Sequence, residues 1–130
     1  MRTHKALIGA AIFALSAVAS ASTWQQISRN VDGDVLIDRD SIVRSGDVVK
    51  VWLMQFHVAG KQSPSLREPI YGDKQQWLLN CATRSIAVGQ VLLTGKNGDL
   101  IYQSSIPTAF LDVVPDSEGE TVLTKVCAHR

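Results

Sequence analysis

After residue 21, stretches rich in Val and Ile lie between frequent turn residues, and some of them alternate between two faces with the period of two that predicts β-strands. Between Gln75 and Arg84, for example, Trp77, Leu79 and Cys81 share one side, and more polar residues occupy the other. Short strands separated by frequent Gly, Asp and Asn turns favour an antiparallel sheet. Six strands are predicted, over Trp24–Arg29, Val35–Asp38, Val48–Val58, Gln75–Arg84, Ala87–Thr94 and Leu100–Ser105.

The predicted strand Val48–Val58 is apolar on both sides, which is typical of a central strand. We expect one side to line the core. The second side then needs cover from the C-terminal helix, a loop, a second subunit of a homodimer or another partner, because contiguous exposed apolar surface is uncommon on monomers. One side carries Val49, Val51 and Leu53, and the other carries Trp52, Met54 and Phe56.

Two connections have distinctive sequences. Asn97-Gly98 predicts a tight hairpin turn with positive φ at both central residues. Asp38-Arg39-Asp40-Ser41 predicts a turn or a short helical step, after which Ile42 returns to the core.

The apolar period changes near the C-terminus to that of a helix. Ser117-Glu118-Gly119-Glu120 follows Pro115 and predicts a capping box. In this motif Ser117 accepts a hydrogen bond from the third helical amide, and Glu120 reaches back to the cap. One face of the predicted helix carries Val122, Leu123, Val126 and Cys127.

The first 21 residues are typical of a secretory signal peptide. Arg2 and Lys5 precede an apolar stretch that ends at Ala19-Ser20-Ala21, whose small residues suit cleavage before Ser22. A retained anchor or a short core helix is the alternative, but the stretch is short for a bilayer. We therefore expect one domain over residues 22–130, exported to the periplasm, the cell surface or the medium. No lipid anchor is expected, because no Cys lies near the cleavage point.

The chain has two cysteines, Cys81 and Cys127, and export to an oxidising compartment predicts a disulfide between them. This bond would pin the helix to the sheet face that carries Trp77 and Leu79. The predicted fold class is α+β: a mainly antiparallel sheet of about six strands with a C-terminal helix tethered to one face. A metal or redox pair is disfavoured, because the chain has no C-x-x-C and only His57 and His129 follow the leader.

Charge excludes one class of partner. Without Arg2 and Lys5 the chain has 11 basic and 12 acidic residues, a net charge of −1. A nucleic-acid binder of this size would show a basic footprint, so we expect no nucleic-acid partner. No apolar run after the leader is long enough for a membrane span.

The residue patterns also predict no enzyme. The chain has no phosphate loop, dinucleotide fingerprint or G-x-S-x-G frame, and His57 has no evident nucleophile or base beside it. A cluster of aspartates does not match a calcium loop, and we expect its members to be solvated turn residues. The sequence thus predicts no catalytic residue, no metal site and no cofactor. The aspartates are Asp32, Asp34, Asp38 and Asp40.

The longest segment without a strand or helix pattern runs from Ala59 to Asp73. Long loops are either mobile connectors or functional, and the sequence leaves both interpretations open. Tyr and Arg often anchor protein interfaces, and an edge strand offers backbone groups to an extended partner. We therefore predict that an edge strand and this loop bind a macromolecule. The candidate partner-binding residues are Lys61, Arg67, Ile70, Tyr71 and Lys74.

The pattern I-D-x-x-S-I-x-R-x-G from Ile37 to Gly46 resembles the surface-adhesin protein E family of Gram-negative bacteria. The resemblance covers essentially the whole chain after the leader, and it implies an antiparallel sheet with a disulfide-tethered C-terminal helix. Its further parts are Trp24, Val49-Lys50-Val51-Trp52, Asn80-Cys81-Ala82, Gly98 to Ile101, Pro115-Asp116-Ser117 and Cys127.

The resemblance also implies a function. The founding adhesin of the family is a homodimer that binds host matrix and serum proteins such as laminin, vitronectin and plasminogen. This chain lacks the lipid-anchor cysteine that surface-retained members carry. We expect an exported, non-enzymatic binding module for host matrix, serum or envelope proteins. The alternative is a periplasmic structural or envelope-associated protein without a host ligand.

Overall fold

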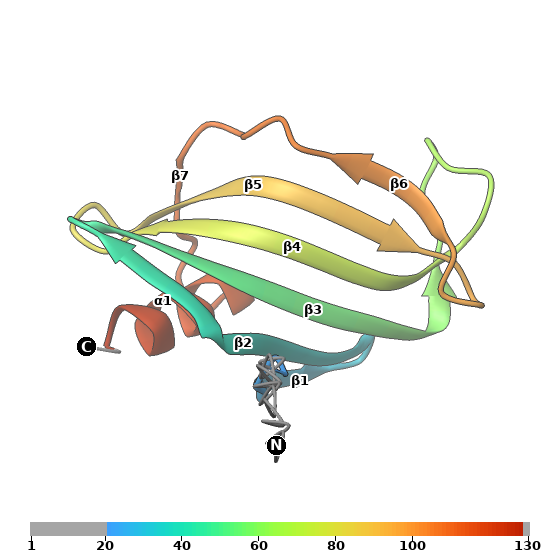
Figure 1. Ribbon diagram of the computed structural model, residues 1–130, viewed down its shortest axis with the longest axis horizontal. Helices are drawn as coiled ribbons and strands as arrows, with labels where there is room; N and C mark the ends of the chain where they lie inside the picture. Colours follow the sequence, from blue (N-terminus) through green and yellow to red (C-terminus); the bar gives the residue numbers. More distant parts are fainter. Residues whose placement is uncertain (1–20, 129–130) are drawn as a thin grey trace, which may run out of the picture.

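The computed structural model describes residues 21–128, so residues 1–20 of the predicted signal peptide lie outside the described residues. Over 21–128 the chain forms one seven-stranded antiparallel sheet and one C-terminal helix (Figure 1). The strands are β1 (Trp24–Asn30), β2 (Gly33–Ser45), β3 (Val48–Lys61), β4 (Ile70–Asn80), β5 (Ser85–Thr94), β6 (Leu100–Ser104) and β7 (Leu111–Asp112), and the helix is α1 (Glu118–Cys127).

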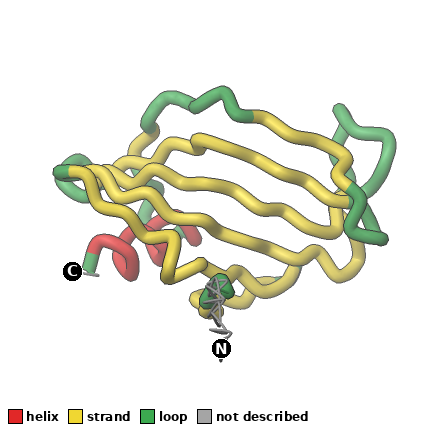
Figure 2. Tube along the Cα trace, in the orientation of Figure 1, coloured by secondary structure: helices red, strands yellow, loops and turns green. Residues whose placement is uncertain are grey.

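The strands lie across the sheet in their sequence order from β1 to β6, and each pairs with its sequence neighbour. The short β7 pairs with the start of β5, beyond the end of β6. The tube in Figure 2 shows the long loops gathered at the ends and along one border of the sheet. This arrangement confirms the predicted fold class, and β7 is the strand that the sequence pattern missed.

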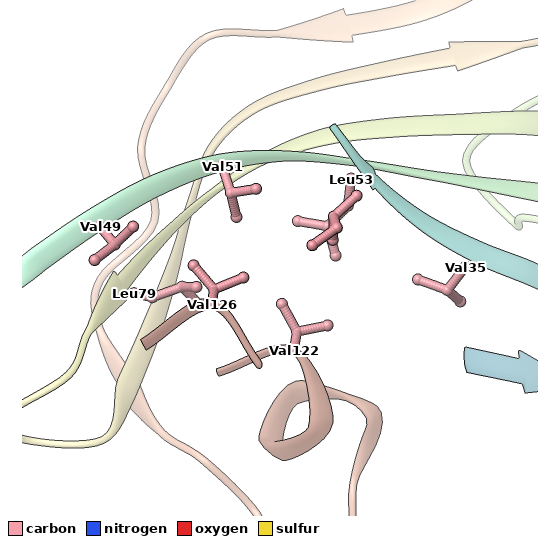
Figure 3. Close-up of a cluster of buried hydrophobic side chains, with 8 residues drawn as sticks. Val35, Val49, Val51, Leu53, Leu79, Val122 and Val126 are labelled. Atoms are coloured by element: carbon pink, nitrogen blue, oxygen red, sulfur yellow. The ribbon is translucent and has the colours of Figure 1, made fainter. Parts of the chain in front are cut away.

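The core lies between one face of the sheet and α1 (Figure 3). Each fully buried aliphatic side chain contributes roughly 1.5–3 kcal/mol. As predicted, α1 packs against the face of the sheet that carries Trp77 and Leu79. This face is called the covered face below. The buried cluster comprises Val35, Ile37, Val49, Val51, Leu53, Leu79, Val122 and Val126.

The disulfide joins Cys81 and Cys127, as predicted, with their Cα atoms 5.7 Å apart. Cys81 lies in the turn after β4 rather than in a strand, and its amide donates to the Asp47 carbonyl at 2.8 Å. The bond therefore ties the last residue of α1 to the end of the sheet where β3 begins and β4 ends.

The start of α1 follows the predicted capping box with one change. The Ser117 hydroxyl accepts from the Glu120 amide at 3.2 Å, as predicted. The Glu120 carboxylate, however, accepts from the Asp116 amide at 2.8 Å, one residue before the cap. Asp116 has a φ of +58°, which turns its amide toward the helix. At Gly119 a Cβ would lie 3.3 Å from Ile86 Cδ1, so glycine lets the helix approach β5 closely.

The prediction of a turn at Asp38–Ser41 is wrong, because β2 continues through this stretch with an irregular register. Side chains replace the missing ladder bonds. The Ser41 hydroxyl donates to the Asp38 carbonyl at 2.7 Å and accepts from the Trp52 amide at 2.9 Å. Asp38 is buried and its carboxylate accepts from the Asp40 amide, so it is not the solvated residue that we expected. Ile42 packs against the core, as predicted.

The hairpin at Asn97-Gly98 is where the sequence placed it, but its conformation differs. The Gly95 amide donates to the Asp99 carbonyl at 2.9 Å, and the Gly98 amide donates to the Gly95 carbonyl at 3.1 Å. The loop therefore holds three residues rather than two. Only Gly98 has a positive φ, of +82°, because a three-residue loop needs one left-handed residue where the predicted turn needs two.

Candidate protein-binding surfaces

The loop between β3 and β4 is shorter than the sequence predicted. β3 extends to Lys61 and β4 begins at Ile70, so residues 62–69 form the loop where Ala59–Asp73 was expected. In Figure 2 it projects beyond the end of the sheet, on the right of the view. Ile70 is buried, with 6% of its surface exposed, and it is the first residue of β4. The nearby Pro69 and Gly72 had suggested that the strand begins later.

The loop is held at both ends. Within it the Leu66 amide donates to the Ser63 carbonyl at 3.1 Å. Gly60, with a φ of +75°, leaves room for the Tyr71 ring, whose atoms would lie about 3 Å from a Cβ there. At the other side Glu68 lies near Gly95, so the loop and the 95–99 hairpin sit together at one end of the sheet. A loop held in this way presents its exposed side chains from a defined position.

The five candidate residues do not form one cluster. Lys61 and Arg67 are exposed at the loop, Tyr71 is half-buried against Gly60, and Ile70 is buried. Lys74 lies elsewhere, with its Nζ 5.5 Å from the centre of the Trp24 ring. Strand alternation would have revealed that Lys74 lies apart from the loop residues, because it shares its side of β4 with Gln76 and Leu78.

The face opposite α1, called the open face below, carries the second apolar side of β3. Trp52 and Met54 are half-buried there and Phe56 is 49% exposed. Because α1 packs on the other face, the helix does not cover the second apolar side of β3, which was one of the expected possibilities. A hollow of about 200 Å³ opens in this face, and its lining residues are Met54, Phe56, Gly72, Asp73, Lys74, Leu92, Thr94 and Leu100.

Arg29 and Asp34 form an ion pair between the edge strand β1 and its neighbour β2. The Arg29 Nε donates to Asp34 Oδ1 at 2.7 Å. This hydrogen bond and the attraction of the Asp34 carboxylate raise the pKa of Arg29, which favours the charged guanidinium.

His57 is the most buried polar residue of the sheet, at 4% exposure. Neither of its ring nitrogens hydrogen-bonds to any group in the described part of the chain. No group of three or more potential metal ligands occurs in residues 21–128. In the same range no helix is both long and apolar enough to cross a membrane.

A third surface follows the outer border of β5. Two hydrogen bonds attach the segment between β6 and β7 to β5. The Thr108 amide donates to the Val88 carbonyl at 2.9 Å, and the Val88 amide donates to the Thr108 side-chain hydroxyl at 2.9 Å. In Figure 1 this orange segment runs along the upper border of the sheet. Sequence reasoning missed it, because β7 has only two residues and leaves no alternation to detect.

Comparison with known proteins gives a family and a fold. The sequence pattern of the family described as surface-adhesin protein E matches residues 24–128. A crystal form of Haemophilus influenzae protein E is similar, with a TM-score of 0.60 at 16% identity, covering 91% of this chain and 97% of that chain. A selenomethionine form of that protein gives 0.59 at 17% identity, covering 85% and 89%. No curated protein matches the chain. At these identities the structural likeness shows the fold alone.

Proposed function

Because the chain belongs to the surface-adhesin protein E family, we propose that it is an exported binding protein that captures other proteins and turns over no substrate. The partners are host matrix or serum proteins, or proteins of the cell envelope. The alternative that the sequence left open, a periplasmic structural protein without a host ligand, is an outcome of the tests below.

The observation that carries this proposal is the loop of residues 62–69. It projects from one end of a disulfide-tethered sheet and is fixed by the buried Ile70 and the Tyr71 ring. Lys61, the last residue of β3, and Arg67, within the loop, are both exposed. A basic pair at a fixed loop suits an acidic patch of a partner protein, because little conformational freedom is lost on binding.

The test replaces Lys61 and Arg67 with Ala in the oxidised protein without its leader. Tyr71 is left unchanged, because it packs against Gly60 and its loss would disturb the fold. The double variant Arg39→Ala with Lys125→Ala is the matched control, since it removes the same charge from exposed residues elsewhere. Both variants should melt within about 2 °C of the parent, as surface changes usually do.

Binding is then measured to immobilised laminin, vitronectin and plasminogen, and separately to an envelope extract. We expect the loop variant to lose roughly 5- to 100-fold in affinity for at least one partner, the range for interface hot spots. Equal binding by both variants would remove the loop from the proposal. Binding to the envelope extract alone would favour the periplasmic alternative.

Export is part of the same proposal. Residues 1–21 act as a signal peptide, and the protein matures as one unanchored domain from Ser22 onward. The mass of the protein recovered from cells tests this, since cleavage after Ala21 fixes the N-terminus. Protease treatment of intact cells then separates surface exposure from a periplasmic location.

A further inference from the structure

The border of the sheet formed by β6, residues 105–110 and β7 concentrates exposed apolar side chains. Of the ten large apolar residues that are exposed in residues 21–128, six lie between 100 and 114. Exposed apolar groups in such density mark interaction sites more often than single scattered ones do. The six are Leu100, Tyr102, Ile106, Phe110, Leu111 and Val114. Together with the exposed carboxylates Asp99, Asp112 and Asp116, they are called the acidic edge.

The charged side chains of residues 97–124 are all acidic. From Asn97 to Thr124 the chain has five acidic residues and no Lys, Arg or His. Glu118 accepts from the Asn30 amide group, and Glu120 pairs with Arg84 at 3.1 Å. The other three carboxylates are exposed and form no ion pair with any described residue. They are Asp99, Asp112 and Asp116.

The acidic edge also has room for a side chain. A hollow of about 350 Å³ lies between the start of β5, β7 and the first turn of α1. Its apolar lining includes Ile86, Val88, Leu111 and Val114. The hollow therefore adds an apolar pocket beside the exposed carboxylates.

The outer sides of β6 and β7 offer backbone groups to an added strand. β6 and β7 each pair with β5 alone among the described strands, so their outer sides face no strand. Lys often blunts sheet edges, and residues 100–112 contain none. Pro107 lies in the segment 105–110, which separates β6 from β7 and forms no strand.

From these observations we propose that the acidic edge binds an extended segment of a partner protein in which apolar residues alternate with Lys or Arg. The partner's backbone adds a strand to the sheet border, its apolar side chains fill the hollow, and its cations meet Asp99, Asp112 and Asp116. The site rests on the proposed binding function and names the chemistry of a second contact, made by residues other than Lys61 and Arg67.

Charge decides against other occupants. An anionic membrane or a nucleic acid would be repelled by three exposed carboxylates. A second copy of the chain bound through the same edge would bring both sets of carboxylates together, because a two-fold contact uses the same patch on both subunits.

The test uses labelled ten-residue peptides and fluorescence anisotropy with the oxidised protein. The probe alternates Val with Lys. One control peptide alternates Val with Glu, and the other alternates Ser with Lys. We expect the Val–Lys peptide to bind at least about tenfold tighter than either control, because each control removes one of the two matched properties.

Protein variants locate the binding. Ile106→Lys places a cation on the acidic edge and should weaken Val–Lys peptide binding by at least about tenfold. Val31→Lys, at a fully exposed position of the β1–β2 turn, is the matched control and should change nothing. The variant lacking Lys61 and Arg67 should also bind the peptide normally. The experiment therefore tests the acidic edge separately from the proposed function of the loop.

Three results would overturn the proposal. The first is equal binding of the Val–Lys and Val–Glu peptides, and the second is unchanged peptide binding by Ile106→Lys. The third is a dimer by light scattering that Ile106→Lys converts to a monomer, since the occupant would then be a second copy. Melting curves establish that each variant is folded before it is scored.

Discussion

The covered face and the open face of the sheet are built from the same strands, yet they do different things. On the covered face, Val49, Val51 and Leu79 are fully buried beneath α1. On the open face, their neighbours Trp52 and Leu78 stay half-exposed, and a hollow opens beside Phe56. Stability therefore comes mainly from one side of the sheet, which leaves the other side, the borders and the loops free to carry binding residues.

Of the substitutions that test this difference between the faces, removal of the disulfide should cause the largest loss of stability. Cys81→Ser, Cys127→Ser and the double variant should each lose about 4 kcal/mol of unfolding free energy, the chain-entropy value for a loop closed over a separation of 46 residues. Urea unfolding at neutral pH measures it. Three equal losses would show one shared bond, whereas a native protein with two titratable thiols would contradict the pairing.

Two adjacent leucines test the faces directly. Leu79→Ala leaves a cavity under α1 and should cost 2–5 kcal/mol, the usual range for buried leucines. Leu78→Ala, on the open face, should cost only about 1 kcal/mol because water already reaches the side chain. Equal losses in urea unfolding would mean that the open face is covered as well.

The cap of α1 has a smaller effect on the covered face. Ser117→Ala removes the acceptor of the Glu120 amide and should cost about 1 kcal/mol, while Ser117→Asp should keep most of the stability. Ser105→Ala, at an exposed position of the β6–β7 connection, is the control and should have no measurable effect. Thermal unfolding distinguishes the three variants.

The smallest effect is expected at Phe56. Phe56→Ser should change the unfolding free energy by no more than about 0.5 kcal/mol, because the ring is already half-exposed. It should also reduce the binding of an apolar dye to the open face. A loss of 2 kcal/mol or more would reveal a cover on that face, such as a second subunit.

The sequence predicted the parts of the fold in which one pattern dominates. Alternation in Val48–Val58 separated the residues of the covered face from those of the open face, and the helical period placed Val122 and Val126 toward the core. The two cysteines fixed the tether. These elements were predictable because burial alone sets the pattern.

The remaining features depend on particular side-chain bonds or on distant packing. Ser41 keeps β2 continuous by bonding to Asp38 and Trp52, which a turn-like composition conceals. Burial of Ile70 shortens the predicted binding loop. The acidic edge depends on the pairing of β7 with β5, which no local sequence pattern predicts.

The order of the elements has a consequence for how the chain folds. Every pairing from β1 to β6 joins sequence neighbours, so the sheet can form hairpin by hairpin without a crossover connection. The side chains that close the core, Val122 and Val126, follow every strand in sequence. Until α1 docks, the nascent sheet is apolar and bare on both sides, and in that interval it is most open to aggregation and proteolysis. Oxidation of Cys81 with Cys127 ends the interval and makes the docked state persist.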